Sequence, residues 1–373
     1  MSKIVIVMPA YNEAENIGKM IEALFNEEFP KIKDTEMHLL VVDDYSPDKT
    51  GDVVKTYQQK YKNLHLLQKQ KEGLGWAYIR GFQYAVNTLQ ADAVMEMDAD
   101  FQHPPRFVKP MVEAYLLGAD YCIGSRYIKG GSVPKEWAFF RKAISFLGNL
   151  FIRIVLTKFK IHDLTTGFRL TREKGVLDQI DLDHLMEPTR FAYKVDLLYQ
   201  SIKLSKKTVE VPLEFASRTM EKSKFNPKEM VSTFKVAVIL GIKDKQKLIK
   251  FGTVGFVGYL INAFFLNFFS KSGFPEWASW GLSTELAIIN NFTLNNLWTF
   301  KTDEIKGIGN IVKKFLQFNF TSLGALLIQT VLGTIGVYFL GPDKRQLLLP
   351  FIIVFVVLPY NYLMYTKVIW KKK

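Results

Sequence analysis

A short acidic segment, Asp98 to Gln102, directly follows an apolar run with the length and composition of a buried strand. Residues two apart in an extended chain point the same way, so Asp98, Asp100 and Gln102 are predicted to converge on one hard divalent cation. Such a cation would bridge to a diphosphate and neutralise the charge that grows on a departing nucleotide diphosphate. The same residues could instead form a strand-end turn and a helix cap before the two prolines that follow. The neighbouring segments of the sequence must decide between a metal site and this alternative.

Two further polar segments follow predicted strands nearer the N-terminus. One begins at Pro9 and contains Tyr11, and the other contains Asp43 and Asp44. Proline cannot continue a strand ladder and tyrosine offers an aromatic face, while an aspartate at a strand end accepts hydrogen bonds from a base or ribose. Ligands of open α/β sheets bind beyond the carboxyl ends of the strands. Three such segments at the ends of adjacent strands therefore predict a nucleotide site.

Short apolar runs alternate with helical stretches over residues 1–225, and this alternation predicts an α/β domain with a mainly parallel sheet. The predicted strands are Lys3–Met8, Met37–Val42, Asn63–Leu67, Ala91–Met97 and Asp120–Gly124. The predicted helices are Glu13–Glu28, Asp48–Tyr61, Gly73–Leu89 and Pro105–Leu117. Each polar segment described above lies where one of these strands ends.

Charge is distributed unevenly along the 373 residues. The stretch from Leu248 to the C-terminus holds 12 Lys/Arg and 5 Asp/Glu, whereas the residues before it hold 37 and 31. With 48% hydrophobic residues overall, this asymmetry predicts a soluble domain followed by a membrane domain and excludes a disordered chain or a disulfide scaffold. Four apolar segments have the roughly 20 residues that a membrane-spanning helix needs. They are Phe251–Ser270, Trp277–Phe300, Phe315–Leu340 and Gln346–Thr366.

Lysines cluster on alternate sides of the four segments, so the positive-inside rule places both the first domain and the C-terminus in the cytoplasm of a multi-pass membrane protein. These clusters also account for much of the net charge of +13, and no basic helix or zinc motif indicates nucleic-acid binding. Cys122 is the only cysteine, so the first domain needs no oxidising compartment. The N-terminal apolar run is too short for a signal peptide.

Residues 226–247 follow a third pattern, in which Met230, Phe234, Val238 and Ile242 recur every four residues. This spacing predicts an amphipathic linker helix in the membrane interface, with a surface helix packed on the first domain as the alternative. The predicted domains are 1–225, 226–247 and 248–373.

Several motifs resemble those of glycosyltransferase family 2, whose GT-A catalytic domain binds a nucleotide sugar. They are Pro9-Ala10-Tyr11-Asn12-Glu13, Val42-Asp43-Asp44, Gly73-x-Gly75-x-Ala77, Asp98-Ala99-Asp100, Gly124-Ser125-Arg126-Tyr127 and Thr166-Gly167-Phe168-Arg169. The resemblance implies a GT-A fold over residues 1–225, with Mn²⁺ or Mg²⁺ held by Asp98, Asp100 and Gln102. The donor-binding set that it implies is Pro9, Tyr11, Glu13, Val42, Asp44, Asp98, Ala99, Asp100, Gln102, Arg126, Lys194, Arg218 and Lys224.

Within that family the chain is most similar to the dolichol- or polyprenol-phosphate mannose synthases. The similarity lies in the segment Asp98 to Pro104 and in Val211-Pro212-Leu213-x4-Arg218-x4-Ser223-Lys224. It implies transfer of mannose from GDP-mannose to a dolichyl or polyprenyl phosphate at the cytoplasmic membrane face. The implied catalytic residues are Asp98, Asp100, Arg126 and Arg218.

Two residues on a predicted helix, Arg141 and Ser145, are implied by the same resemblance to meet the acceptor phosphate. They are one helical turn apart and share a face, although a basic helix near a membrane needs no catalytic role. A phosphate is already an anion at pH 7, so we expect an inverting displacement without a strong general base. His103 is therefore not expected to be essential.

The membrane half resembles the GtrA-like four-helix domains, which are associated with polyprenyl-linked sugars. The resemblance lies in Phe251-x2-Val254-Gly255-x6-Asn262 and Asn290-Asn291-Phe292-x2-Asn295-x2-Trp298-Thr299-Phe300. Similar segments at Phe251 and Phe320 suggest a duplicated helical hairpin, with chance similarity as the competing explanation. Pairing of membrane helices would give a homodimer. The alternative functions are the same chemistry with UDP-glucose, and a lipid-linked sugar flippase with a nucleotide-sugar sensor.

Overall fold

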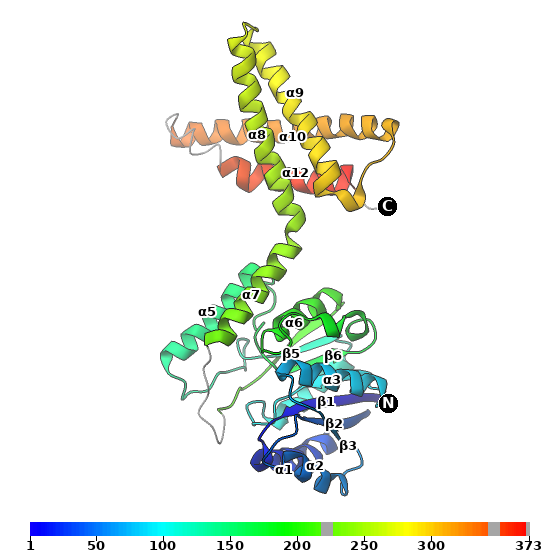
Figure 1. The fold of residues 1–373 in the computed structure, drawn as a ribbon. Helices are drawn as coiled ribbons and strands as arrows, with labels where there is room; N and C mark the ends of the chain where they lie inside the picture. Colours follow the sequence, from blue (N-terminus) through cyan, green and yellow to red (C-terminus); the bar gives the residue numbers. More distant parts are fainter. Residues whose placement is uncertain (218–226, 342–350, 371–373) are drawn as a thin grey trace. The chain divides into compact units, whose positions relative to one another are not determined.

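The computed structural model describes residues 1–217, 227–341 and 351–370 of the chain. It divides the chain into two compact units, Met1–Ile242 and Lys243–Lys373. The first unit is an α/β domain, whereas the second is helical (Figure 1).

The first unit is built on a seven-stranded sheet with the order β3-β2-β1-β4-β6-β5-β7. The strands are β1 (Ser2–Ala10), β2 (Thr35–Asp43), β3 (Leu64–Gln68), β4 (Ala93–Glu96), β5 (Tyr121–Ser125), β6 (Arg169–Arg172) and β7 (Thr208–Pro212). All neighbours pair in parallel except β6, which runs antiparallel to both β4 and β5. The mainly parallel sheet and its first five strands are thus confirmed, while β6 and β7 were not predicted.

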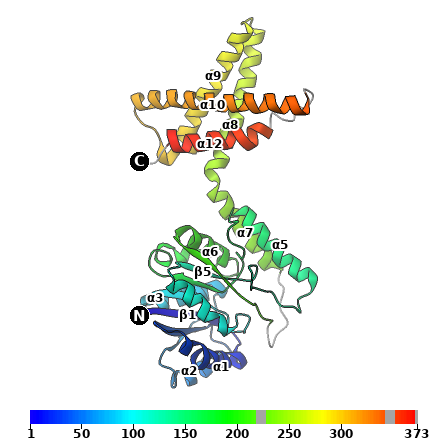
Figure 2. The same ribbon diagram turned by 180° about the vertical axis from the view of Figure 1, so that it is seen from behind.

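Strand β1 shows how the sequence separates the two faces of the sheet. Ile4, Ile6 and Met8 belong to one buried core, and the alternate residues Val5 and Val7 belong to another, because successive strand residues point to opposite faces. Helices α1 (Ala14–Glu22), α2 (Thr50–Gln58) and α4 (Val108–Leu116) contribute to the first core. Helices α3 (Leu74–Asn87) and α6 (Tyr193–Leu204) contribute to the second (Figures 1 and 2).

Helix α7 (Pro227–Asp244) packs on the first unit beside helix α5 (Phe139–Val155). Its residues Val236, Ala237 and Leu240 share a core with Ile152 of α5. The predicted four-residue series is divided between two environments, because Phe234 is partly buried against this core whereas Val238 and Ile242 are exposed. Helix α7 thus packs on the first unit and also carries exposed apolar residues, and its place in the membrane interface stays a prediction.

The second unit contains helix α8 (Gln246–Lys271), helix α9 (Glu276–Leu294) with a π-helical end (Asn295–Thr299), and helix α10 (Ile308–Leu340). Its last described segment begins with a π-helix (Ile353–Val357) and continues as α12 (Leu358–Met364). It then has a second π-helical end, Tyr365–Ile369. Phe300 and Trp370 directly follow the two π-helical ends, and their rings stack with centroids 4.5 Å apart. The two helices thus end alike, and the duplication of a helical hairpin stays a prediction.

Among the described residues, one helix is both long and apolar enough to cross a membrane, over Gln246–Phe269. Val354–Ile369 is a shorter apolar helix. Part of the fourth predicted span, Gln346–Thr366, lies outside the described residues.

A chain of titratable side chains joins β2 and β3. His38 Nε2 lies 2.9 Å from Glu36 Oε1, and His38 Nδ1 lies 2.9 Å from His65 Nε2. Because a carboxylate only accepts, the His38 ring donates to Glu36, and its other nitrogen is hydrogen-bonded to His65. Burial and the neighbouring His38 ring lower the pKa of His65. Folding therefore favours the neutral form of His65.

This lowered pKa predicts a loss of stability in acid. The unfolded chain binds a proton at His65 at a higher pH than the folded chain does. The contribution of neutral His65 to the free energy of unfolding is therefore complete above the ordinary histidine pKa and is lost as pH falls below it. We expect the free energy of unfolding of the first unit to decrease from pH 7 to pH 5, and to decrease less in His65→Gln. Denaturant unfolding across this range measures both. Identical pH slopes for the two proteins would contradict the prediction.

Candidate active site

A cavity of about 370 Å³ opens at the carboxyl ends of β1, β2 and β4. Residues from the three polar segments line it together, although they are far apart in the chain. The lining includes Pro9, Tyr11 and Glu13 after β1, Asp44 after β2, and Asp98, Ala99, Asp100 and Gln102 after β4. The predicted gathering of these segments at one edge of the sheet is confirmed by the geometry. We call this the donor cavity.

The acidic segment is a turn and not an extended strand, because β4 ends at Glu96. Phe101 has φ +61°, and the backbone N–H of Gln102 donates to Asp100 Oδ1 at 3.1 Å. Asp98, Asp100 and Gln102 still line one cavity. The expected convergence is therefore present, but it arises from a tight turn and not from strand alternation.

Asp98 is oriented by two neighbours. The Tyr78 hydroxyl donates to Asp98 Oδ1 at 2.8 Å, and the Asp98 backbone N–H donates to His103 Nδ1 at 3.1 Å. His103 is buried between Phe168 and Phe215, and burial lowers the pKa of its ring to about 4. At neutral pH this histidine is uncharged and serves as an acceptor that fixes the acidic turn.

The side chains at the acidic turn fit a hard divalent cation. Two carboxylates and one amide, from Asp98, Asp100 and Gln102, line one cavity, and such cations take oxygen ligands of these kinds. In the described part of the chain, no three His, Cys, Asp or Glu side chains gather as a metal site. A cation held here would therefore depend on the amide and on oxygens of a ligand as well as on the two aspartates.

Lys194 lies behind the acidic turn and not among the residues that line the donor cavity. Its side chain is fully buried, with Nζ 3.8 Å from Asp98 Oδ1 and 3.9 Å from Glu96 Oε2. Arg169 Nη1 lies 4.0 Å from Glu96 Oε1. Burial raises the pKa of Glu96 despite these two cations. The resemblance placed Lys194 at the donor phosphates, whereas the structure places it as a counter-ion of Asp98.

The motif Gly73-x-Gly75 allows the first turn of α3 to approach a neighbouring loop. Gly73 has φ +116°, and a Cβ on Gly75 would lie 2.3 Å from the carbonyl oxygen of Pro188. The Trp76 N–H donates to this same oxygen at 3.0 Å. Any larger residue at position 75 would displace the helix terminus that borders the donor cavity.

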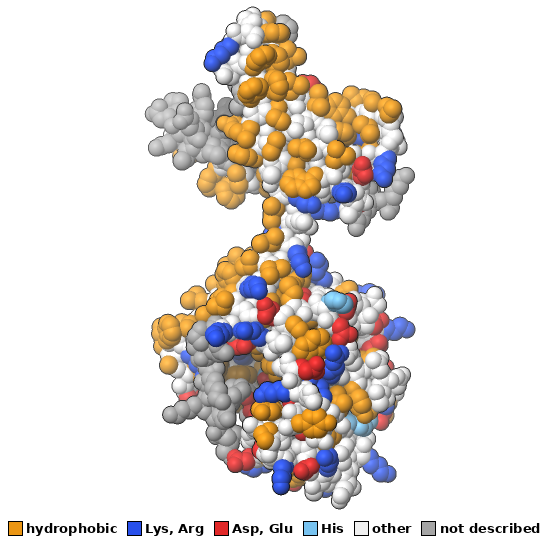
Figure 3. Space-filling model, viewed as in Figure 1, with side chains coloured by type: hydrophobic (Ala, Val, Ile, Leu, Met, Phe, Trp, Pro, Cys, Tyr) orange, Lys and Arg blue, Asp and Glu red, His pale blue; other side chains and the backbone are white. Residues whose placement is uncertain are grey.

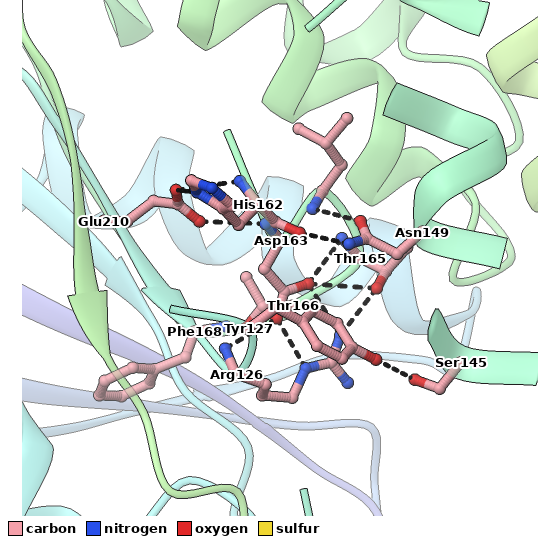
Figure 4. Close-up of polar contacts among 11 residues, drawn as sticks. Arg126, Tyr127, Ser145, Asn149, His162, Asp163, Thr165, Thr166, Phe168 and Glu210 are labelled. Atoms are coloured by element: carbon pink, nitrogen blue, oxygen red, sulfur yellow. Dashed lines mark hydrogen bonds and ion pairs between the residues drawn. The ribbon is translucent and has the colours of Figure 1, made fainter. Parts of the chain in front are cut away.

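Arg126, directly after β5, is held in a buried clamp (Figure 4). Its Nε and Nη2 donate to the two carboxylate oxygens of Asp163 at 2.7 and 2.8 Å, and Nη2 also donates to Thr165 Oγ1 at 2.7 Å. Burial alone would raise the pKa of Asp163, but the charge and hydrogen bonds of Arg126 outweigh it and hold this pKa below its ordinary value. The pair is therefore ionised, and the guanidinium has a fixed orientation.

A second cavity of about 550 Å³ lies between α5, α7 and the Arg126 clamp. Arg141 and Ser145 line it, and Arg141 lies over the ring of Trp137 at 3.8 Å. Their contact with an acceptor phosphate stays a prediction. Arg126 and Thr165 line both cavities. The two cavities therefore meet at the buried clamp, and we call the second one the acceptor cavity.

Apolar side chains on α5 and α7 face outward near the acceptor cavity (Figure 3). Phe139 and Phe140 are 87% and 73% exposed, and Leu147, Val231 and Ile242 are also exposed. Clusters of large exposed apolar residues mark surfaces that contact a partner or a membrane.

One further described residue of the predicted donor set, Val42, is not among the residues that line the donor cavity. Val42 is fully buried in the core of the sheet. Arg218 and Lys224 lie outside the described residues.

The sequence analysis also missed residues that contribute to the site. Lys71 lies over the ring of Tyr11 at 3.2 Å, and Lys69 lies 3.3 Å from Asp44. Burial raises the pKa of Asp44, and the Lys69 charge opposes this effect. The basic residues that follow the third strand were a visible signal for these contacts, whereas nothing local indicated Asp163.

Comparison with known proteins agrees with this geometry. Residues 5–178 match the model of glycosyl transferase family 2, and residues 250–370 match that of the GtrA/DPMS transmembrane domain. A dolichol-phosphate mannosyltransferase of Pyrococcus furiosus is 33% identical over 95% of this chain and 97% of its own. An undecaprenyl-phosphate mannosyltransferase of Micrococcus luteus is 36% identical over 60% of this chain and 88% of its own.

Among solved structures, a glucosyl-3-phosphoglycerate synthase from Mycobacterium tuberculosis, in complex with Mn²⁺, UDP and phosphoglyceric acid, is 16% identical. It covers 65% of this chain and 78% of its own, with a TM-score of 0.45.

The fold, the site and the full-length relative define a glycosyltransferase with a membrane domain. The chain belongs to glycosyl transferase family 2 and carries a GtrA/DPMS transmembrane domain at its C-terminal end.

The buried clamp predicts a large effect of a small change. Asp163→Asn keeps the shape of the side chain but leaves the Arg126 charge buried without its partner, so we expect the free energy of unfolding to fall by about 3 to 5 kcal/mol. The exposed pair Arg106–Glu214, with a 2.8 Å contact, provides the control. Glu214→Gln is expected to change stability by less than about 1 kcal/mol. Denaturant unfolding in detergent measures both, and equal effects would contradict the prediction.

Proposed function

We propose that the chain transfers mannose from GDP-mannose to a dolichyl or other polyprenyl phosphate, with inversion at the anomeric carbon. The observation that carries the proposal is the meeting of two cavities at Arg126, one lined by an acidic turn and the other by Arg141 and Ser145. The names of the two mannosyltransferase relatives support the sugar and the lipid class. A nucleotide sugar in one cavity and a lipid phosphate in the other would bring the reacting groups together at the clamp.

The reaction would form one bond and break one. An oxygen of the lipid phosphate attacks C1 of the sugar, and the bond from C1 to the β-phosphate oxygen breaks, so that the electron pair leaves with GDP. The lipid phosphate is already an anion at pH 7, so no side chain has to remove a proton. The protein contributes orientation and fixed positive charge, which are the main sources of rate in such transfers.

The residues divide this work between them. Arg126 has a fixed guanidinium at the junction and would stabilise charge on the diphosphate, while Arg141 and Ser145 would hold the lipid phosphate. Asp98, Asp100 and Gln102 would hold Mn²⁺ or Mg²⁺, which when bound neutralises charge on the diphosphate. Lys194 and Tyr78 would keep Asp98 in place from behind the cavity wall.

The membrane arrangement is part of the proposal. The exposed apolar residues of α5 and α7 would face the bilayer surface, so that a long lipid reaches the acceptor cavity without leaving the membrane. The second unit would cross the bilayer several times, with the catalytic domain and the C-terminus in the cytoplasm. The predicted boundaries at 225 and 247 and the possible homodimer remain predictions.

Sugar transfer in detergent tests the proposal. Purified full-length protein with polyprenyl phosphate and Mn²⁺ or Mg²⁺ is offered GDP-mannose and UDP-glucose in parallel, and the lipid extract is analysed by mass spectrometry. We expect product from GDP-mannose alone, and its loss with EDTA. Asp100→Asn should lower turnover by about 100- to 1,000-fold. Asp52→Asn, at an exposed pair with Lys55, is the control. Product from UDP-glucose alone would refute the donor, and activity in EDTA would refute the metal.

His103 provides a separate test of the base-free mechanism. Its ring is neutral and accepts from the backbone of Asp98, so it orients the acidic turn and does not take a substrate proton. We expect His103→Asn to slow turnover by less than about 100-fold, which is below the contribution of a typical general base. Steady-state kinetics of the folded variant measure this. A loss as complete as that of Asp100→Asn would refute the mechanism.

A further inference from the structure

Two consecutive residues at the end of β5 point to different sides of the junction between the cavities. Arg126 is clamped by Asp163, and Tyr127 extends toward α5 (Figure 4). The Tyr127 hydroxyl lies 2.6 Å from Ser145 Oγ, and its ring meets Phe146 edge to face at 6.0 Å. One short stretch of backbone therefore touches both the donor side and the acceptor side.

Helix α5 has a second polar attachment, one turn beyond Ser145. Asn149 is only 2% exposed. Its Oδ1 accepts from the backbone N–H of Leu164 at 2.8 Å, and its Nδ2 donates to the carbonyl oxygen of His162. These two residues flank Asp163, the partner of Arg126 (Figure 4). Asn149 thus ties α5 to the loop that holds the clamp.

The same loop is supported from the sheet. Glu210 of β7 accepts from the backbone N–H groups of His162 and Asp163 at 2.9 and 3.0 Å. The loop is therefore fixed on one side by β7 and on the other by Asn149. A helix attached to it is attached to the rigid part of the domain.

These attachments add to the packing of α5 on α7, where the rings of Phe151 and Phe234 meet edge to face with centroids 5.0 Å apart. Asn149 and Ile152 are the only buried residues of α5 in the described part of the chain. Apolar contact is not directional, whereas hydrogen bonds restrict both distance and angle. Arg141, Ser145 and Asn149 are spaced by four residues and share one face, so the bonds of Asn149 also aim Arg141 and Ser145.

We propose that Tyr127 and Asn149 are positioning residues that hold the acceptor face of α5 in register with Arg126. In this arrangement the Tyr127 hydroxyl donates to Ser145 Oγ, and Ser145 directs its own proton into the acceptor cavity. A phosphate oxygen only accepts. If Ser145 instead donated to Tyr127, a lone pair of Ser145 would face the anion. Burial raises the pKa of Tyr127, which keeps the hydroxyl protonated as this role requires. The inference rests on the proposed lipid-phosphate acceptor.

The first test is a double-mutant cycle on Tyr127 and Ser145. The affinity for citronellyl phosphate, a short isoprenyl phosphate, is measured from the fluorescence of Trp137, which lines the acceptor cavity. We expect Y127F to weaken binding by about 3- to 10-fold, the usual effect of one lost hydrogen bond, and S145A to weaken it at least as much. The double variant should bind no more weakly than S145A alone, because Tyr127 acts through Ser145.

Controls separate positioning from general destabilisation. Y127F should leave GDP affinity within experimental error of the wild type, and it should lower the midpoint of thermal unfolding no more than the loss of one other tyrosine hydrogen bond does. Tyr61 also donates a hydrogen bond to a side chain, to Asn26 at 2.8 Å, and Y61F is the matched variant expected to change neither affinity. Additive losses in the double variant, or Y127F binding citronellyl phosphate as tightly as the wild type, would overturn the inference.

Asn149 has a different expected signature. N149A should weaken both citronellyl phosphate and GDP, because the loop around Asp163 loses one of its supports. Asn63 donates to the carbonyl oxygen of Met37 at 3.2 Å, and N63A is the matched control expected to leave both affinities unchanged. Retention of wild-type affinity for both ligands by N149A would overturn its part of the inference. If N149A does not fold, the double-mutant cycle on Tyr127 and Ser145 decides whether the acceptor face of α5 is positioned as proposed.

The binding assay does not depend on turnover, so the two proposals fail separately. Wild-type protein that binds citronellyl phosphate with the expected cycle, but transfers neither sugar, would refute the proposed donor and keep the positioning role. Wild-type protein that does not bind citronellyl phosphate would refute the acceptor and the positioning role together. Transfer of mannose with an additive cycle would keep the function and refute the positioning role.

Discussion

The Asp163 carboxylate accepts three hydrogen bonds from Arg126, two from the guanidinium and one from the backbone, in a region removed from water. Burying either charge alone would cost several kcal/mol, so each side chain needs the other. The bidentate geometry leaves the guanidinium one orientation. Both cavities, the loop that carries Thr165, and the attachment of α5 are arranged around this pair.

A second buried charge group supports the donor side. Lys194 and Arg169 face Glu96, and Lys194 also faces Asp98 from behind the cavity wall. Two acids and two bases therefore balance within the protein. Asp98, Asp100 and Gln102 all line the donor cavity, where the proposed function has them meet a substrate and its cation.

In the proposed function, the acceptor cavity has to bind a polyprenyl phosphate, which is a charged group on a very apolar tail. Exposed aromatic and aliphatic residues on α5 and α7 lie close to a cavity that contains Arg141. The same helix therefore presents apolar residues outward and polar residues toward the clamp, as an amphipathic interfacial helix does. In the proposed function, chemistry and membrane attachment share α5, which explains why its rotation has to be fixed by Tyr127 and Asn149.

The sequence alone determined those features that depend on neighbouring residues. The alternation along β1, the acidic segment after β4 and the apolar second half of the chain are local patterns, and parallel strands bring their carboxyl ends together in any sheet of this class. The donor-cavity residues Tyr11, Asp44 and Asp98 could therefore be predicted together. The family motifs added Arg141 and Ser145, which the structure places in one cavity.

Only the tertiary structure decided which charges would pair. Asp163 and Arg126 are distant in the chain, and β6 enters the sheet in the antiparallel direction, so no local pattern indicates that these two side chains meet. For the same reason Lys194 lies behind Asp98 and not beside a phosphate, and Asn149 is buried on a helix whose spacing looks like that of an ordinary surface helix. Side-chain type sets what a residue can do, whereas the packing of segments far apart in sequence sets which partner and how much water it has.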